Sequence, residues 1–172
     1  LPEARDLLRK AGAEVSGERV RFDPAHIEEL VSHAPAEFTL HARNPENSIR
    51  IGGNAMAFGT IASPPNAADI DGGRRTGNQA GVRNFLKLAQ YFNCIHFLSG
   101  YPVEPIDIHA SVRHLEALRD MALMTDKPFH AYSLGAERIL DGIEIARLAR
   151  GISAGQMERE PSLFSIVNTN SP

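Results

Sequence analysis

From residue 77 onward, short apolar segments alternate with amphipathic helices, and this pattern limits the possible folds more than any other feature. The expected helices carry the apolar stripes that begin at Val82, Ile108 and Ile139, and the expected strands cover 94–98, 128–132 and 162–167. These strands are apolar throughout, which is typical of a parallel sheet buried on both faces. A spacing of about 35 residues per unit suits a TIM barrel or a doubly wound sheet. Since no G-x-G-x-x-G motif follows any strand, we expect an α/β fold containing a partial TIM (β/α) barrel.

The first part of the chain predicts a small α+β extension with antiparallel strands. We expect a helix over 2–11, a short hairpin that turns at Ser16-Gly17-Glu18, a helix that begins at Asp23-Pro24, and strands over 38–41, 48–51 and 55–58. The segment 63–77, SPPNAADIDGGRRTG, has no hydrophobic period and predicts a connecting loop. The chain is therefore expected to divide into an extension (1–62), this loop (63–77) and the first βα units of an incomplete barrel (78–172).

Composition excludes several classes of partner. The 172 residues carry a net charge of −3, which does not favour nucleic acid or an anionic membrane. No apolar run approaches the roughly 20 residues needed to span a bilayer. The single cysteine predicts a reducing compartment, and we expect a cytoplasmic protein. The chain starts without methionine and stops directly after a predicted strand, so we expect it to be a piece of a longer protein that is inactive alone.

The 63–77 loop contains some of the residues that an anion site or a metal site needs. Gly72-Gly73 with Arg74 and Arg75 could hold an anion, but the loop lacks the Walker pattern and also contains Asp69 and Asp71. The two aspartates lack a third close ligand, so no metal is expected. We predict a rigid connection near the barrel mouth in which an arginine pairs with an aspartate. Whether Asp71, Arg74 and Arg75 also contact a partner stays open.

The histidines and the cysteine do not indicate a catalytic or metal-binding site. His109 and His114 are five residues apart and share no helix face, while His96 and His130 lie in apolar strands and are expected to be satisfied core or rim histidines. Cys94 begins a strand and is expected to be a small buried side chain. These residues predict neither a metal site nor an activated nucleophile.

The carboxyl ends of the predicted strands are the better place for a site, because barrel active sites assemble there. These ends carry Ser99, Gly100, Tyr101, Tyr132, Asn168 and Asn170. The two tyrosines and two amides suit the binding of a small ligand, and a tyrosine face attracts an ammonium cation by about 1–2 kcal/mol when desolvated. An equally good reading is that Tyr101 and Tyr132 only cap the barrel.

Several segments resemble one known family. These are GERVRFDPAHIEELVSHAPAEFTLHARNP, IGG, FGT, PPNAADIDGGRR, GYPVEP, DKPFH and the terminal NTNSP, in this order along nearly the whole chain. They resemble the trimethylamine methyltransferase family, which acts on trimethylamine or on quaternary amines such as glycine betaine. The resemblance implies a TIM barrel and a chain about three times as long.

The resemblance also implies a mechanism. The substrate is a small methylated amine, and the methyl acceptor is the cobalt of a reduced corrinoid (cobalamin) carried by a separate partner protein, so that this chain binds no cofactor itself. Asn168 and Asn170 match a family segment at the end of a barrel strand and are expected to bind the substrate beside Tyr101 and Tyr132. We expect the full-length protein to form homo-oligomers.

Two other functions remain open from the residues alone. One is a barrel lyase or aldolase whose phosphate-bearing substrate is held by Gly72-Gly73-Arg74-Arg75. It would need a Schiff-base lysine or a metal, and Lys10, Lys87 and Lys127 lie outside the predicted strands. The other is a non-catalytic module that binds a small molecule.

Overall fold

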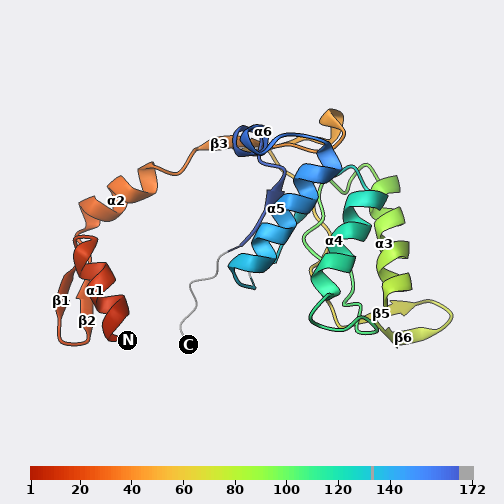
Figure 1. Ribbon diagram of the computed structural model, residues 1–172, viewed down its shortest axis with the longest axis horizontal. Coiled ribbons are helices and arrows are strands. Elements are labelled where there is room, and N and C mark those ends of the chain that lie inside the picture. The colour runs from red at the N-terminus through yellow and green to blue at the C-terminus, as the bar shows by residue number, and fades with distance from the viewer. Residues whose placement is uncertain (133, 167–172) are drawn as a thin grey trace. The chain divides into compact units, whose positions relative to one another are not determined.

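The computed structural model describes residues 1–132 and 134–166, and the chain separates into two compact units (Figure 1). The first unit covers Leu1–Ala36, and the second begins at Glu37. No helix among the described residues is long and apolar enough to cross a membrane.

The first unit is a helix, a hairpin and a second helix. Its elements are α1 (Pro2–Lys10), β1 (Glu14–Ser16), β2 (Arg19–Arg21) and α2 (Pro24–Ser32). β1 and β2 pair antiparallel, and Gly17 takes a φ of 60° at their turn, where a side chain would be strained. Asp23 caps α2 by accepting a hydrogen bond of 2.9 Å from the Ala25 N–H. The hairpin and the two helices predicted here, including the start of the second at Asp23-Pro24, are confirmed.

The second unit mixes helices with small sheets. Its elements are β3 (Glu37–Leu40), η1 (Pro45–Asn47), β4 (Ile49–Gly52), β5 (Asn66–Asp69), β6 (Gly73–Thr76), α3 (Gln79–Tyr91), α4 (Arg113–Met124), β7 (Phe129–His130), α5 (Ala136–Arg150), α6 (Ala154–Arg159) and β8 (Leu163–Phe164). β3 pairs with β4 and β5 with β6, both antiparallel, whereas β7 and β8 are parallel.

Four strand segments lie next to one another in chain order and run parallel, and we call them the parallel series: the segments at Gly59 and at Phe97-Leu98, β7 and β8. Gly59 bridges to Phe97, Leu98 bridges to Phe129 at the start of β7, and β7 pairs with β8, all in parallel. α3, α4 and α5 connect successive members and lie side by side in Figure 1. The alternation of strand and helix expected from the sequence is therefore present. The described residues form no closed barrel.

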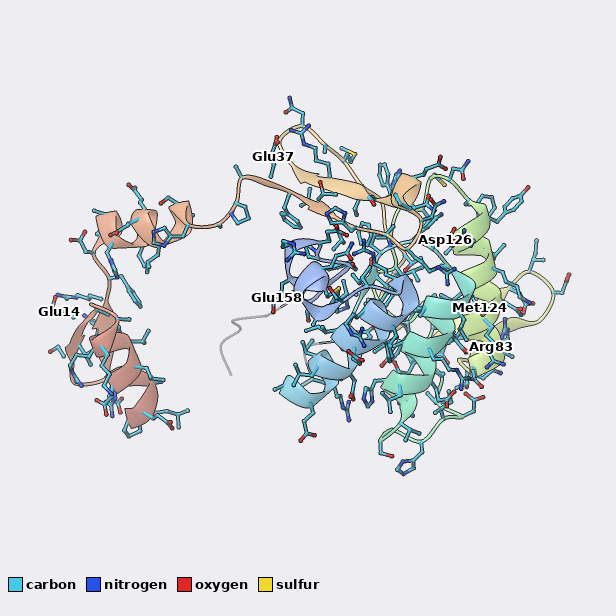
Figure 2. The ribbon with its side chains drawn as sticks, turned by 45° about the horizontal axis from the view of Figure 1, so that its top comes forward. Glu14, Glu37, Arg83, Met124, Asp126 and Glu158 are labelled. Carbon is cyan, nitrogen blue, oxygen red and sulfur yellow. The ribbon has the colours of Figure 1, made fainter. Side chains whose placement is uncertain are left out.

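The helices bury one face of the parallel series. The main core contains Val82, Leu86, Leu98, Met121, Phe129, Ala131 and Ala146 among other apolar side chains. Each large apolar side chain that leaves water here contributes about 1.5–3 kcal/mol, so this contact orders the unit. Arg83 of α3, labelled in Figure 2, also binds the buried Asp120 of α4 through hydrogen bonds of 2.8 and 3.2 Å.

The β3–β4 hairpin covers the amino ends of the parallel series. The His41 N–H donates to the carbonyl of Pro161 at 2.7 Å, and the Arg43 N–H donates to the carbonyl of Asp126 at 3.1 Å, just before β8 and β7 respectively. An apolar cavity of about 140 Å³ lies between the hairpin and the sheet, and it is lined by Phe38, Leu40, Ile49, Ile51, Phe97 and Phe164. This end of the series is therefore closed by apolar side chains.

Three local expectations were wrong. The 55–58 segment forms no antiparallel strand, because the chain leaves β4 and joins the parallel series at Gly59. α4 begins at Arg113 rather than near Ile108, because the Arg113 guanidinium binds the Ile108 carbonyl and closes a turn before the helix. The 63–77 segment contains the β5–β6 hairpin in place of an irregular loop, and α6 was not predicted. The three-part division of the chain stays a prediction.

Candidate functional site

The inward side of the parallel series is the side that faces away from the helices, and Gly59, which has no side chain, helps to identify it. A Cβ on Gly59 would lie 2.4 Å from the Phe97 ring and 2.5 Å from the Ser99 hydroxyl. Gly59, Phe97 and Ser99 therefore face the same side, which is opposite to the helix-facing Leu98. Glycine is required at this position because its neighbours already fill the space.

Five rings gather from different segments of the parallel series, and we call them the aromatic cluster: Phe97, Tyr101, His130, Tyr132 and Phe164. The ring centroids lie 5.3 Å apart for Phe97 and Phe164, 5.2 Å for His130 and Phe164, and 5.0 Å for His130 and Tyr132. Tyr101 and Tyr132 meet edge to face at 4.7 Å. The cluster runs from the middle of the series to its carboxyl end, where the two tyrosines lie.

Tyr132 is the polar centre of this end. Its hydroxyl accepts a hydrogen bond of 3.1 Å from the Tyr101 N–H and bonds to the Ser63 hydroxyl. A side chain on Gly100 would collide with this hydroxyl, and Gly100 has a φ of 138° that disfavours any other residue. Burial raises the pKa of both Tyr101 and Tyr132, so both rings remain neutral phenols.

Ser63 is held in a strained backbone conformation at this site. It alone among the described non-glycine residues has a positive φ, of 45°. Its N–H donates to the Tyr101 carbonyl at 2.7 Å, which fixes the segment against the tyrosine pair. Such a conformation costs on the order of 1–3 kcal/mol and is found most often where a site has to be held in place.

His130 is the unusual member of the cluster. Its side chain is buried, with 5% of the residue exposed, and neither ring nitrogen makes a hydrogen bond of good geometry to the described residues, although the Ser99 backbone lies close to the ring. Burial lowers the pKa of His130, and the neighbouring Ser99 backbone opposes this shift only in part. Each buried polar atom without a partner costs about 1–3 kcal/mol. His130 is thus a core histidine as expected, but its hydrogen bonding is less complete than expected.

Three other histidines each have a hydrogen-bond partner on at least one ring nitrogen. His96 accepts a hydrogen bond of 2.9 Å from the Phe58 N–H, and His109 bonds to the Ser111 hydroxyl at 2.8 Å. Nε2 of the buried His114 lies 2.9 Å from the Asp141 carboxylate. Within the described ranges no group of three His, Cys, Asp or Glu side chains could hold a metal ion. Cys94 is exposed, contrary to expectation, because the chain turns before it enters the parallel series.

The predicted site residues fall into three groups. Tyr101 and Tyr132 come together, with Tyr101 almost fully buried and Tyr132 half-buried. Asn168 and Asn170 lie outside the described residues. Asp71, Arg74 and Arg75 lie on the exposed β5–β6 hairpin. Whether any of them binds a ligand or partner stays a prediction.

The hairpin confirms the predicted arginine–aspartate pair. Arg75 donates to the Asp69 carboxylate at 3.3 Å, and the Gly72 N–H bonds to the same carboxylate. These bonds hold the pKa of Asp69 below its usual range. The segment that leads into this hairpin is bound to the segment that follows Tyr101, because the Glu104 N–H donates a hydrogen bond of 3.0 Å to the Pro64 carbonyl. The sequence singled out the 63–77 segment, but it gave Ser63 no role at the site.

Comparison with known proteins gives consistent matches. The model of the family described as trimethylamine methyltransferase (MTTB) matches residues 1–172. The glycine betaine methyltransferase of Desulfitobacterium hafniense strain Y51 is 37% identical over 169 residues, which cover 98% of this chain and 35% of that protein. The trimethylamine methyltransferase MttB of strain DSM 10664 / DCB-2 is 25% identical over 168 residues, which cover 95% of this chain and 33% of that protein. The chain thus spans about a third of the length of these curated relatives.

Proposed function

The chain belongs to the trimethylamine methyltransferase family, and from this premise we propose that its protein transfers a methyl group from a methylated amine to a corrinoid on a separate protein. The amine is trimethylamine or a quaternary amine such as glycine betaine, the compounds that appear in the names of the two relatives. The acceptor is the cobalt of the reduced corrinoid, which acts as a second substrate.

The observation that carries the proposal is the tyrosine pair at the carboxyl end of the parallel series. Neutral aromatic faces attract an ammonium group by about 0.5–2 kcal/mol each, without the desolvation cost of a buried carboxylate. Tyr132 keeps exposed surface and is the ring that contacts the ammonium group. Tyr101, which is 5% exposed, supports Tyr132 from the core side.

The chemistry requires positioning more than acid–base catalysis. The methyl group leaves without its bonding electron pair, which stays on the amine nitrogen, and the new carbon–cobalt bond uses the electron pair of the reduced acceptor. A quaternary amine leaves as a neutral tertiary amine without any proton transfer, and trimethylamine reacts as its protonated trimethylammonium form, which leaves as neutral dimethylamine. The aromatic cluster orients the amine and keeps water away from the reacting methyl group.

The proposed architecture is the first part of a TIM barrel. The parallel series has barrel-like strand order, with a helix between successive members. Apolar grooves of about 430 Å³ lie along both outer members, one beside Gly59 and α3 and one beside β8, α5 and α6. Further βα units would pack in these grooves and enclose the aromatic cluster. Asn168 and Asn170 would then join the amine site, and the Asp71–Arg75 hairpin would lie where the corrinoid protein approaches.

The competing functions lack an equivalent observation. Arg75, which a phosphate-bearing substrate would need, already binds Asp69. Lys127, a candidate Schiff-base lysine, is buried with its Nζ donating to the Ala89 and Phe92 carbonyls at 2.6 and 2.9 Å. Neither contact favours a lyase or an aldolase.

A reconstituted assay tests the proposal. The full-length protein is mixed with a purified corrinoid protein in its reduced state and with trimethylamine or glycine betaine, and the cob(I)alamin spectrum is followed. We expect loss of that spectrum with at least one amine. Tyr132→Ala should slow the reaction at least about tenfold, while Tyr91→Ala, which changes an exposed tyrosine on α3, should leave the rate unchanged. No demethylation of any tertiary or quaternary amine would overturn the proposed function.

A further inference from the structure

The two ring nitrogens of His130 make no hydrogen bond of good geometry to the described residues, and the nearby Ser99 backbone makes at most a weak one. A neutral imidazole has one N–H donor and one lone pair. The Tyr132 hydroxyl, the nearest polar group of the neighbouring ring, is already bonded to Ser63 and to the Tyr101 N–H. His114 provides a contrast, because Asp141 binds one nitrogen of that buried ring. A polar group from outside the chain can therefore gain a hydrogen bond at His130 if it reaches the buried ring and displaces the weak contact with the Ser99 backbone.

The position of His130 limits what that group can be. β7 and β8 place it in register with Phe164, and its ring lies 5.0 Å from Tyr132. A ligand that places its cationic end against Tyr132 can bring its other end to His130 only if the two ends are close together. The trimethylammonium and carboxylate groups of glycine betaine are separated by a single methylene group.

We propose that the His130 N–H donates a hydrogen bond to a carboxylate of the methylated amine, so that the site selects a betaine over an amine without a carboxylate. This inference rests on the proposed function and assigns a specificity role to a residue of the same site. A neutral donor suits this role, since an arginine or lysine would repel the ammonium group close by. Burial, which lowers the pKa of His130, keeps the ring neutral.

Selectivity between two ligands of the same charge tests the inference. Glycine betaine and tetramethylammonium both carry a quaternary nitrogen, but only glycine betaine carries a carboxylate. Their affinities for the full-length protein are measured by calorimetry in wild type and in His130→Phe, which keeps a flat ring without a hydrogen-bonding group. His130→Asn and His130→Gln keep an amide donor near the positions of Nδ1 and Nε2. His114→Phe is the matched control for the loss of a buried histidine.

The expected result is a loss confined to the carboxylate-bearing ligand. His130→Phe should weaken glycine betaine binding by about 10- to 100-fold, the range for a hydrogen bond to a charged group, and change tetramethylammonium binding by less than about threefold. At least one amide variant should recover part of the affinity, and His114→Phe should leave the ratio of the two affinities unchanged. In wild type, an ¹⁵N NMR shift of the His130 ring on adding glycine betaine, without a similar shift from tetramethylammonium, supports the same assignment independently of any variant.

Other outcomes overturn the inference in distinguishable ways. Equal weakening of both ligands, or no weakening, means that His130 has a structural role or binds only a water molecule. A wild-type protein that binds tetramethylammonium but not glycine betaine also refutes the role. If methyl transfer occurs and His130→Phe leaves the selectivity unchanged, only this inference fails. If no amine is demethylated, the proposed function fails, and the binding ratio still decides the role of His130.

Discussion

At the scale of single residues, Tyr132 joins segments that are distant in the sequence. Its hydroxyl binds Ser63 and the Tyr101 N–H, and its ring contacts Tyr101 and His130. Ser63 is in turn held at a positive φ. Because these contacts share one phenol group, removing a single oxygen atom should disturb the carboxyl end of the parallel series without creating a large cavity.

Tyr132→Phe should lower the free energy of unfolding by about 1–3 kcal/mol, because it leaves the Ser63 hydroxyl and the Tyr101 N–H without their partner. Urea denaturation of variant and wild type measures the change. Tyr91→Phe is the control, because Tyr91 is 78% exposed, and a surface change of this kind usually costs less than about 0.5 kcal/mol. Equal stability of Tyr132→Phe and wild type would show that the hydroxyl contacts contribute nothing.

The His130 ring should titrate below the ordinary histidine value of 6.5, since burial disfavours its charged form. The unfolded chain then takes up a proton at a higher pH than the native chain. Stability from this group is therefore fully present above pH 6.5 and is lost as the pH falls from there towards the lowered native pKa. NMR titration of the ring Cε1–H gives the pKa directly.

The same effect can be measured as stability. Unfolding free energies of wild type and His130→Phe are compared at pH 7 and pH 5. The variant should lose less stability on acidification, because the remaining histidines are common to both chains. A native His130 pKa at or above 6.5, or equal losses in the two chains, would contradict this assignment.

The sequence predicted correctly that Tyr101 and Tyr132 come together, because this depends only on the order of the strands. The tyrosines were found because residues at the carboxyl ends of parallel strands gather at one edge. Their convergence is observed, and their ligand contacts remain predictions. Ser63 and the unpaired nitrogens of His130 could not be predicted, because a backbone angle and a missing hydrogen bond depend on groups far away in the sequence.

At the scale of elements, local patterns predicted helices better than strands. α3 and α5 follow apolar stripes that a sequence displays directly, and Gly151 ends α5 with a φ of 65°. The 55–58 segment was expected to form an antiparallel strand, but the chain pairs only at Gly59, with Phe97 and in parallel. A short apolar run does not identify its partner strand. The β5–β6 hairpin was missed because Asp69, Gly72 and Arg75 form its turn through side-chain bonds that no periodicity reveals.

The end of α3 depends on a buried lysine. Lys127 Nζ donates to the carbonyl of Ala89, which has no further turn of helix to bind it, and to the carbonyl of Phe92, which also accepts from the Ile95 N–H. Lys127→Met should therefore lower the unfolding free energy by about 2–3 kcal/mol and accelerate hydrogen exchange in the last turn of α3. Lys87→Met, an exposed change on the same helix, serves as the control. If the two variants exchange at equal rates in this turn, Lys127 does not stabilise it.

At the scale of the whole molecule, the parallel series connects fold and function. Its helices bury one face, the β3–β4 hairpin closes the amino ends, and the aromatic cluster extends along the inward face to the carboxyl ends. The alternation of strands and helices predicted an α/β arrangement, and the mixed fold agrees with it. The described residues form no closed barrel, and the chain spans about a third of its relatives' length.

The central claim is that the tyrosine end of the aromatic cluster binds the methylated ammonium group. A crystal structure of the full-length protein with glycine betaine tests it most directly. We expect the trimethylammonium group to lie within about 6 Å of the Tyr132 ring centroid, on the inward side of the parallel series. A glycine betaine molecule bound in the same protein without contact to Tyr132 or any other member of the cluster would contradict it.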